Sequence, residues 1–462
     1  MNDINYIELI KKFSYMETSE ELFKIKDGNY FFWDIVRIDI LVYLFNKTQD
    51  KRNIRPWPIH KKTNIFIRIL KNLRNESINF LIRLCLKNKN SKFIFFKTLR
   101  IKNTYKTTYD PILDDPFNAL DSSKTSFDLL LQATYFNSLK AIFNKTAVLP
   151  MPRTIFGIKY PEINEVIKKI LTAVKKHFEI NIENCEEIIL DSIIKYVSDL
   201  NFWESVFKNY RPESIILCDN GSFKGLYAAA KKFNIKVYEF QHGDIGKNNL
   251  RYFYPKSIEA NLQCNLPYSL LTFSKYWNND ISYPIKQIIS VGNNNFTLQR
   301  EAFEKDNENL MIISTAIYQN TLINFVKDLS KKIHDKNIKI FYKLHPEEFK
   351  DRIAIEDSFS DFKNVQIVED ELSLKELINS CQHIIGIHST LINICLNAGC
   401  NIYLYKKGFY SAHEDIMEFV ETFDDLDSFI KIYDEKSKNK TIKMPIFFEK
   451  FNKQKFLRII NG

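Results

Sequence analysis

Short apolar runs alternate with helical segments through the second half of the chain, and this alternation constrains the fold more than any other feature. Residues 214–218 and 235–240 are typical of buried strands, and residues 223–233 between them are typical of a helix. The same order recurs from Leu310 to Tyr405. Strands that alternate with helices indicate parallel sheets. Because 462 residues are too many for one ordinary core, we expect two such domains.

A break in this pattern divides the chain near Gly292–Asn295. We assign residues 1–292 to an N-terminal domain and residues 293–462 to a C-terminal domain, whose last helix is expected to return to the first. With 45% hydrophobic and 26% charged residues, the composition is that of a globular protein. Each domain is therefore expected to have an α/β fold built on a parallel sheet.

The sequence shows no targeting or metal-binding pattern. Residues 1–5 lack the basic and apolar regions of a secretory signal, and no apolar run reaches the ~20 residues that a membrane span needs. The seven cysteines include no CxxC pair. We therefore expect a reduced, cytoplasmic protein without a zinc site.

Positive charge is concentrated in residues 51–106, which contain 16 Lys and Arg residues and one acidic residue, Glu76. Between Lys61 and Leu86, apolar residues recur at helical spacing with basic residues among them. Such a basic amphipathic helix can lie on an anionic membrane surface, or it can pack on the protein with its charge facing water. Nucleic acid is not an expected partner, because no nucleic-acid-binding motif accompanies the charge.

Polar residues follow two neighbouring strands of the N-terminal domain, and open α/β sheets bind ligands at the carboxyl ends of their strands. They are Asp219, Asn220 and Gly221 after the first strand, and Gln241, His242 and Gly243 after the second. The Asp219 carboxylate can act as a general base or a nucleophile, or it can only cap the next helix. The His242 ring can protonate a leaving phosphate or bind a substrate carboxylate, or it can pair with a buried carbonyl. Gly243 would let the backbone approach a ligand closely.

A third strand of this domain is expected at Phe93–Phe96. The loop after it contains Tyr109 and Asp110, which would then lie at the carboxyl end of the strand. We predict that both side chains contact a substrate.

Two motifs of the C-terminal domain also follow expected strands. The first contains Lys343, His345, Pro346 and Glu347, and the second contains Ser389 and Thr390. Pro346 favours an extended backbone at His345, which aims the ring out of the strand end. Lys343 and His345 supply donors for a phosphate, and Glu347 can bind ribose hydroxyls. The hydroxyls of the second motif can cap a helix, bind phosphate or do both, because the two roles share one geometry.

Three further residues of this domain are weaker candidates. Ser314 follows the first expected strand, where it can contact phosphate or cap a helix. His388 and His413 are more often structural in such positions.

The set Asp219-Asn220-Gly221, Gln241-His242-Gly243, His345-Pro346 and Ser389-Thr390 resembles the motifs of bacterial GT-B enzymes that use CMP-activated acidic sugars. It is similar to the bacterial sialyltransferases, and more similar to the β-Kdo transferases of capsule and lipopolysaccharide biosynthesis, where Kdo is 3-deoxy-manno-octulosonic acid. The second acidic residue of the sialyltransferase motif is Asn220 here, which favours the Kdo type. The resemblance covers about residues 210–400.

This resemblance implies a GT-B architecture, in which two Rossmann-like parallel-sheet domains face a central cleft. Residues 1–292 would be the acceptor side and residues 293–462 the donor side. Asp219 would be the nucleophile of a retaining transfer, with His242 beside it. The resemblance assigns His345, Ser389 and Thr390 to the donor phosphate. From their positions at strand ends we expect Lys343, Pro346, Glu347 and Ser314 to bind the donor nucleotide as well. Their positions at strand ends also lead us to expect contacts to the sugar or the acceptor from Asn220, Gly221, Gln241, Gly243, Tyr109 and Asp110.

The implied donor also bears on cofactors and partners. A CMP-sugar has a single phosphate, so no metal ion is expected. The partners would be a CMP-activated sugar, a glycan or glycolipid acceptor and an anionic inner-membrane surface, to which a cytoplasmic enzyme binds peripherally. The alternatives are a UDP- or GDP-sugar transferase of the same outline, a CDP-alditol phosphotransferase of teichoic-acid type, and a polysaccharide-assembly binding protein with a degenerate site.

Overall fold

The computed structural model describes residues 6–27, 30–48, 92–98, 110–123, 127–132, 147–149, 163–180, 182–219, 221–246, 248–258, 264–279, 281–298, 308–333, 338–369, 372–435 and 445–462. Most of the basic segment, residues 51–91 and 99–106, lies outside these ranges, as do Tyr109 and Asn220. Within them, no helix is both long enough and apolar enough to cross a membrane.

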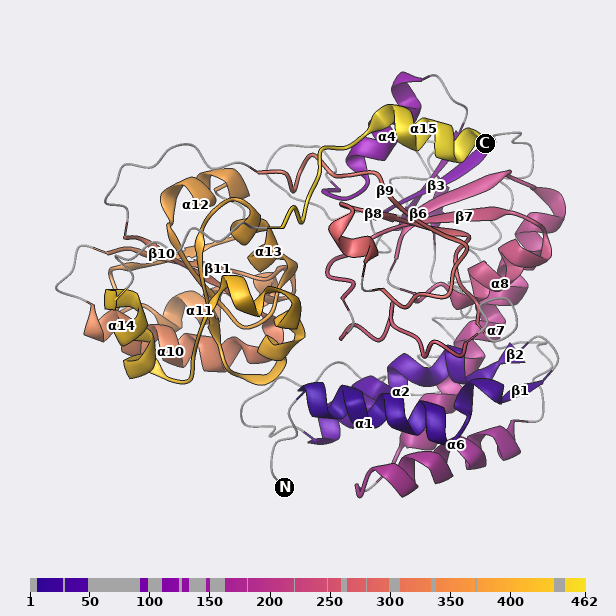
Figure 1. The fold of residues 1–462 in the computed structure, drawn as a ribbon, viewed down its shortest axis with the longest axis horizontal. Coiled ribbons are helices and arrows are strands. Elements are labelled where there is room, and N and C mark those ends of the chain that lie inside the picture. Colours follow the sequence, from indigo (N-terminus) through magenta and orange to yellow (C-terminus); the bar gives the residue numbers. More distant parts are fainter. Residues whose placement is uncertain are drawn as a thin grey trace. The chain divides into compact units, whose positions relative to one another are not determined.

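The chain divides into two compact units, each built on one large sheet (Figure 1). Unit 1 comprises Met1–Leu9, Phe45–Trp57 and Asn294–Glu449. Unit 2 comprises Ile10–Leu44, Pro58–Asn293 and Lys450–Gly462.

Unit 2 contains a seven-stranded sheet in the order β5-β4-β3-β6-β7-β8-β9, and all neighbouring strands are parallel. The strands are β3 (Phe93–Thr98), β4 (Phe127–Gln132), β5 (Ala147–Leu149), β6 (Ser214–Cys218), β7 (Lys236–Phe240), β8 (Ser269–Thr272) and β9 (Gln287–Ser290). Its helices are α4 (Asp114–Ser122), α6 (Asn164–His177), α7 (Cys185–Asn209), α8 (Lys224–Lys232) and α15 (Lys453–Asn461), together with most of α1 (Tyr6–Ser19) and α2 (Phe32–Thr48). The smaller elements are a two-stranded sheet, β1 (Lys26–Asp27) with β2 (Tyr30–Phe31), and the 3-10 helices η1 (Leu22–Lys24) and η2 (Tyr276–Asn278).

Unit 1 contains a six-stranded parallel sheet in the order β12-β11-β10-β13-β14-β15. The strands are β10 (Leu310–Ile313), β11 (Ile340–Lys343), β12 (Val365–Val368), β13 (His383–Gly386), β14 (Asn401–Tyr405) and β15 (Glu421–Phe423). The helices are α10 (Gln319–Lys332), α11 (Arg352–Ser358), α12 (Leu374–Ser380), α13 (Thr390–Asn397) and α14 (Leu426–Glu435), with 3-10 helices η3 (Ala316–Tyr318), η4 (Pro346–Asp351) and η5 (Gly408–Phe419).

The predicted pair of parallel-sheet α/β domains is confirmed. In both sheets the chain first builds three strands outward in one direction and then crosses to the other side of the first strand. This is the 3-2-1-4-5-6 strand order of the Rossmann fold. The order reverses between β3 and β6 in unit 2, and between β10 and β13 in unit 1. Ligands of open α/β sheets bind at the carboxyl ends of the strands that flank such a reversal.

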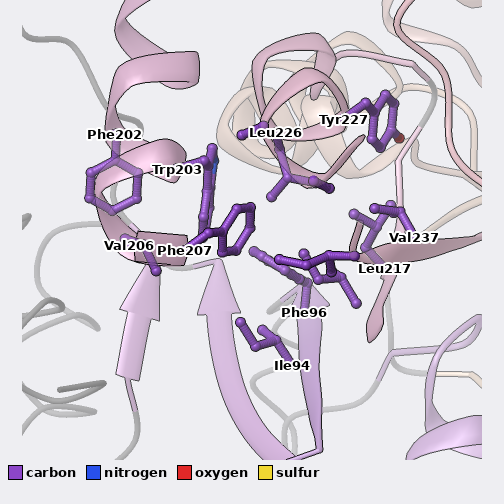
Figure 2. Close-up of a cluster of buried hydrophobic side chains, with 14 of the residues drawn as sticks. Ile94, Phe96, Phe202, Trp203, Val206, Phe207, Leu217, Leu226, Tyr227 and Val237 are labelled. Carbon is purple, nitrogen blue, oxygen red and sulfur yellow. The ribbon is translucent and has the colours of Figure 1, made fainter. Parts of the chain in front are cut away.

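Apolar side chains of the sheet and of the helices α7 and α8 form the core of unit 2 (Figure 2). Trp203 and Phe207 of α7 and Leu226 of α8 pack against residues of β3, β6 and β7. The two helices approach closely at Gly225, where an added Cβ would lie 2.6 Å from the Cβ of Asp199. The tight contact fixes the start of α8, which follows the loop that carries Asp219.

The C-terminus belongs to unit 2. The N–H of Asn452 donates to the carbonyl of Val291 at 2.7 Å, and Lys453 donates to the Ser122 hydroxyl at 2.8 Å. As a result α15 lies beside α4, as Figure 1 shows.

Candidate functional site

Asp219 lies directly after β6 and is almost buried, with 8% of its surface exposed. Its Oδ1 accepts a hydrogen bond from the Ser222 hydroxyl at 2.5 Å, and its Oδ2 accepts one from the Phe223 N–H at 2.8 Å. Gly221 between them has a φ of +80°, which favours glycine. Asp219 therefore caps the turn that leads into α8. A carboxylate oxygen can accept a second hydrogen bond, so capping does not exhaust its capacity for a ligand.

The predicted Gln241-His242-Gly243 motif follows β7, the strand next to β6. Gln241 is fully buried, and its side-chain amide donates to the Gly243 carbonyl at 2.6 Å and accepts from the Phe273 N–H at 2.9 Å. The amide thus joins the loops after β7 and β8, which is a structural role that the sequence did not predict. Gly243 has a φ of +136°, and His242 beside it is half-buried.

Asp110 caps a turn as well. It is 2% exposed, and its Oδ1 accepts hydrogen bonds from the N–H groups of Ile112 at 3.0 Å and Leu113 at 3.1 Å. The carboxylate therefore holds the chain at the entry to α4. The other predicted substrate contacts nearby, Tyr109 and Asn220, lie outside the residues that the structure describes.

A fully buried carboxyl group that we did not predict, Glu239, lies within β7. The Tyr227 hydroxyl is 2.8 Å from its Oε2, and the Tyr252 hydroxyl is 3.2 Å from its Oε1. Burial and then the nearby Asp219 raise the pKa of Glu239 to about 8. The available signal was an acidic residue inside a run otherwise typical of a buried strand.

A buried ion pair anchors α2 to the start of α8. The ammonium of Lys224 lies 2.8 Å from Oδ1 of Asp34, which also accepts from the Tyr254 hydroxyl at 3.1 Å. Oδ2 of Asp34 accepts from the Asn265 N–H at 2.8 Å. Burial alone would lower the pKa of Lys224, but attraction to Asp34 raises it above its ordinary value. Lys224 therefore remains charged and fixes the helix that Asp219 caps.

In unit 1, two hydrogen bonds of His345 close the His-Pro loop. The N–H of His345 donates to Oε2 of Glu348 at 2.8 Å, and the N–H of Glu347 donates to Nδ1 of His345 at 3.2 Å. The φ of −74° and ψ of 146° at His345 are extended, as Pro346 predicts. Because Nδ1 accepts, a neutral ring carries its proton on Nε2. Glu347 is exposed, whereas Glu348 is fully buried.

Ser314 lies beneath this loop and is 2% exposed. Its hydroxyl donates to Oε1 of Glu348 at 2.8 Å and lies 2.8 Å from the Tyr342 hydroxyl. The helix-cap alternative for Ser314 is not observed, because Thr315 is the residue at the start of η3. Ser314 instead supports the buried carboxylate that holds the His345 N–H.

Lys343 ends β11, and its ammonium donates to the main-chain carbonyl of Glu369 after β12. The side chain also passes over the ring of Phe349, with the ammonium 5.9 Å from the ring centroid. In this arrangement Lys343 joins two neighbouring strand ends of the sheet.

Ser389 caps α13, as the sequence allowed. Its hydroxyl accepts from the Leu391 N–H at 3.2 Å, and Thr390 is the first helical residue. The Ser389 N–H donates to Nε2 of His413 at 3.2 Å. His413 is 3% exposed, and its ring centroid lies 4.9 Å from that of His388. Burial lowers the pKa of His388 to about 4 and that of His413 well below its ordinary value, so both rings are neutral at pH 7.

The predicted residues thus gather at one edge of each sheet, considered separately. In unit 2, Asp219 and His242 follow adjacent strands, and β6 flanks the reversal of strand order. In unit 1, Ser314, His345 and Ser389 follow β10, β11 and β13, and the first and last of these strands flank the reversal.

The chain was also compared with known proteins. No protein-family model matches it, and no curated protein matches it. Among solved structures, UDP-GlcNAc 2-epimerase from Methanocaldococcus jannaschii in complex with UDP-GlcNAc and UDP is 14% identical with a TM-score of 0.47, covering 80% of this chain and 99% of that chain. The calicheamicin glycosyltransferase CalG4 is 9% identical with a TM-score of 0.45, covering 81% and 94%. MurG from Acinetobacter baumannii is 12% identical with a TM-score of 0.40, covering 72% and 86%. At these identities and TM-scores, no activity or site is carried over from them.

Proposed function

We propose that this protein is a glycosyltransferase that moves an acidic sugar, Kdo or a related ulosonic acid, from a CMP-sugar to a surface-polysaccharide acceptor. The observation that carries the proposal is that the motif residues follow strands at the two reversals of strand order. Asp219 follows β6 at the reversal in unit 2, and Ser389 follows β13 at the reversal in unit 1. These are the positions at which open α/β sheets bind ligands.

The proposed reaction proceeds in two displacements at one carbon. The Asp219 carboxylate attacks the anomeric carbon, the bond from this carbon to the phosphate oxygen breaks, and CMP leaves with the electron pair. The acceptor hydroxyl then attacks the same carbon and releases the carboxylate, and its proton passes to solvent. Two inversions give net retention. Hydrogen bonds at both oxygens fix the orientation of the Asp219 carboxylate, which favours attack in one direction.

His242 is proposed to bind the sugar carboxylate or the leaving phosphate. It follows the strand next to the one before Asp219. A histidine in this position can donate a hydrogen bond to either anion.

The nucleotide would be held by unit 1. His345 donates through Nε2 to the phosphate, and the Ser389 and Thr390 hydroxyls lie at the start of α13, where a helix favours an anion. Glu347 is exposed beside His345 and is proposed to accept from the ribose hydroxyls. The nucleotide would be CMP rather than UDP or GDP, which rests on the resemblance of the motifs.

Thermal-shift titration with CMP, CDP, UDP and GDP tests the nucleotide. A ligand raises the free energy of unfolding by RT ln(1 + [L]/Kd), about 2.7 kcal/mol at one hundred times Kd. We expect CMP to stabilise the protein most, and His345→Ala to weaken CMP binding by about 1.5–3 kcal/mol. Unchanged CMP affinity in a folded His345→Ala variant would contradict the proposed phosphate site, and a preference for UDP, GDP or CDP would favour the alternatives.

Asp219 variants test the chemistry. We expect Asp219→Ala and Asp219→Asn to lose nearly all release of CMP from CMP-Kdo while they still bind CMP. Because Asp219 also caps α8, Ser222→Ala serves as the control: it removes one capping bond, worth about 1 kcal/mol, but keeps the carboxylate. Intact-mass spectrometry with donor and no acceptor is expected to detect a sugar adduct on the wild type. Near-normal turnover in Asp219→Ala would refute the assignment, and an inverted product without an adduct would make Asp219 a general base.

The segment from Lys61 to Arg83 is proposed to hold the enzyme at an anionic membrane surface. The support is the excess of basic residues in residues 51–106, since each Lys or Arg near such a surface contributes about 1 kcal/mol. Flotation should recover the protein with anionic liposomes at low salt and less of it at high salt. Equal recovery with neutral and anionic liposomes would exclude this role.

A further inference from the structure

Glu239 belongs to a chain of buried hydrogen bonds that ends at Asp219. It is 0% exposed, and the two tyrosines that contact it, Tyr227 and Tyr252, are each 1% exposed. The Tyr227 hydroxyl is 2.8 Å from Oε2, and the Tyr252 hydroxyl is 3.2 Å from Oε1. The Tyr252 hydroxyl is also 3.0 Å from the main-chain carbonyl oxygen of Asp219. Tyr252 thereby connects the side chain of Glu239 on β7 to the main chain of Asp219, which follows β6.

A count of hydrogens decides how these groups are protonated. The Asp219 carbonyl can only accept, so the single hydrogen of Tyr252 must point to it if that bond is made. The contact between Tyr252 and Oε1 then needs a hydrogen from Glu239. Oε2 can accept from Tyr227 in the same arrangement. All three contacts are satisfied at once only when Glu239 is protonated.

We infer that Glu239 is a positioning residue for Asp219, whose neutral carboxyl group orients Tyr252 so that the Tyr252 hydroxyl holds the Asp219 carbonyl. This inference rests on the proposed function of Asp219. Ionised Glu239 would compete with the carbonyl for the one hydrogen of Tyr252, and hydrogen bonds to charged acceptors are the stronger ones. The Asp219 carbonyl would then lose its buried donor, and a second negative charge would lie near the nucleophile.

The groups that face Glu239 agree with this assignment. The titratable ones are Asp219 after β6, Lys224 and Tyr227 of α8, Tyr252 in the loop after β7, and Tyr283 before β9. Burial, followed by the Asp219 charge, raises the pKa of Glu239 to about 8, while Lys224 acts in the opposite direction more weakly. Burial also raises the pKa of both hydrogen-bonded tyrosines well above the ordinary value, so each keeps its hydrogen.

The loop that carries Tyr252 is itself fixed by α2. The guanidinium of Arg37 donates to the carbonyls of Leu250 at 2.7 Å and Phe253 at 3.3 Å. Glu17 holds the other side of the same guanidinium at 2.7 Å. The main chain on both sides of Tyr252 is therefore held in place. A change in the protonation of Glu239 would then reorient the Tyr252 hydroxyl and alter its hydrogen bond to Asp219.

Infrared spectroscopy tests the proton on Glu239 without any ligand. The wild type should show the C=O stretch of a buried protonated carboxyl group at neutral pH, and the band should disappear as the pH rises through about 8. Glu239→Gln should lack the band, and Tyr283→Phe should keep it. Tyr283 is the matched control, because its hydroxyl has no hydrogen-bond partner among the described residues although its ring packs on Tyr252 at 5.4 Å. A wild-type spectrum without the band at neutral pH would overturn the inference.

Release of CMP from CMP-Kdo tests the positioning role. Wild-type kcat should fall as the pH rises through about 8, and Glu239→Gln should remove this alkaline decline, since an amide can accept from Tyr227, donate to Tyr252 and never ionise. Tyr252→Phe should lower kcat about tenfold and leave CMP affinity unchanged, because the hydrogen bond that holds the Asp219 carbonyl is lost. Tyr283→Phe should keep the wild-type pH profile.

Two outcomes distinguish the proposed function of Asp219 from the role of Glu239. Retained turnover in Asp219→Ala would overturn the proposed function and, with it, the role of Glu239. If Asp219→Ala is inactive but Glu239→Gln keeps the alkaline decline, the proposed function stands and the inference about Glu239 is overturned.

Discussion

Removing the buried carboxylate of Glu348 should loosen the His-Pro loop, whereas removing the exposed carboxylate of its neighbour Glu347 should not. Glu348 accepts from the His345 N–H and from the Ser314 hydroxyl, each at 2.8 Å, and is fully buried. In Glu348→Ala both donors lose this acceptor. Ser314 can turn to Tyr342, also at 2.8 Å, so the main loss is at the His345 N–H.

The magnitude follows from the contacts. Loss of a buried acceptor costs about 1–3 kcal/mol, and the cavity left by the side chain adds to it, so we expect a local loss of about 2–4 kcal/mol. Glu348→Gln should cost less, because the amide oxygen can accept from His345 while the amide nitrogen donates to Ser314. Glu347→Ala should change stability by less than about 0.5 kcal/mol, since the main-chain N–H that donates to His345 remains.

Amide hydrogen exchange measured by mass spectrometry resolves this loop separately from the rest of the chain. A loss of about 2–4 kcal/mol corresponds to exchange roughly 30–900 times faster in the peptide that contains residues 343–351. The variants also separate the two glutamates by function. If Glu347 binds ribose as proposed, Glu347→Ala weakens CMP binding without faster exchange, and Glu348→Ala does both. Equal exchange in Glu347→Ala and Glu348→Ala would refute the reasoning.

Three further substitutions or conditions test the packing and the electrostatics. Gly225→Ala should lower the free energy of unfolding by about 1–3 kcal/mol, because its Cβ would lie within 2.6–2.9 Å of atoms of α7; urea denaturation measures this, and a stabilised variant would show that the helices can separate at no cost. Lys224→Ala should lower the free energy of unfolding by about 3–5 kcal/mol, because the buried Asp34 carboxylate loses its ammonium partner. In the same assay, the double variant Lys224→Ala/Asp34→Asn should recover part of this loss, because the buried charge is gone. Burial holds the pKa of His413 well below its ordinary value, so below about pH 6.5 the unfolded chain binds more protons and the free energy of unfolding should decrease as the pH is lowered. The protection factor of the Ser389 amide, which compares its exchange with that of an unfolded peptide at the same pH, should decrease too, and a constant protection factor would contradict the bond to His413.

The fold was predictable because it depends on patterns along the chain. Apolar runs such as 214–218 and 310–313 could be recognised as buried strands, since strands covered on both faces lack polar alternation. Because the strands are parallel, the motifs that follow them could also be placed together at the carboxyl ends of the strands in each sheet. Strand order was not readable, because it is decided by crossovers that the local pattern does not contain. The reversals next to Asp219 and Ser389 came only from the structure.

Roles of individual side chains were less predictable than their positions. The sequence placed Gln241 at the correct strand end but could not show that its side-chain oxygen would accept a hydrogen bond from Phe273, which follows the next strand of the sheet. Of the adjacent glutamates 347 and 348, it singled out the exposed one. A 3-10 turn after Pro346 directs successive side chains to different sides, so which carboxylate turns inward depends on the turn and on Ser314 below it.

Glu239 shows why a buried acid is hard to interpret from sequence. Within residues 235–240 it interrupts an otherwise apolar strand. From the sequence alone, such an acid can equally indicate an exposed edge of the strand or a wrong strand assignment. Its partners Tyr227 and Tyr252 lie 12 and 13 residues away on opposite sides, on a helix and on a loop. No local pattern joins these three residues. Because an unpaired buried carboxylate would cost several kcal/mol, the strand can contain Glu239 only where other segments supply hydroxyls and where a proton neutralises it. The same requirement that makes the residue costly to fold therefore makes it sensitive to the charge of Asp219.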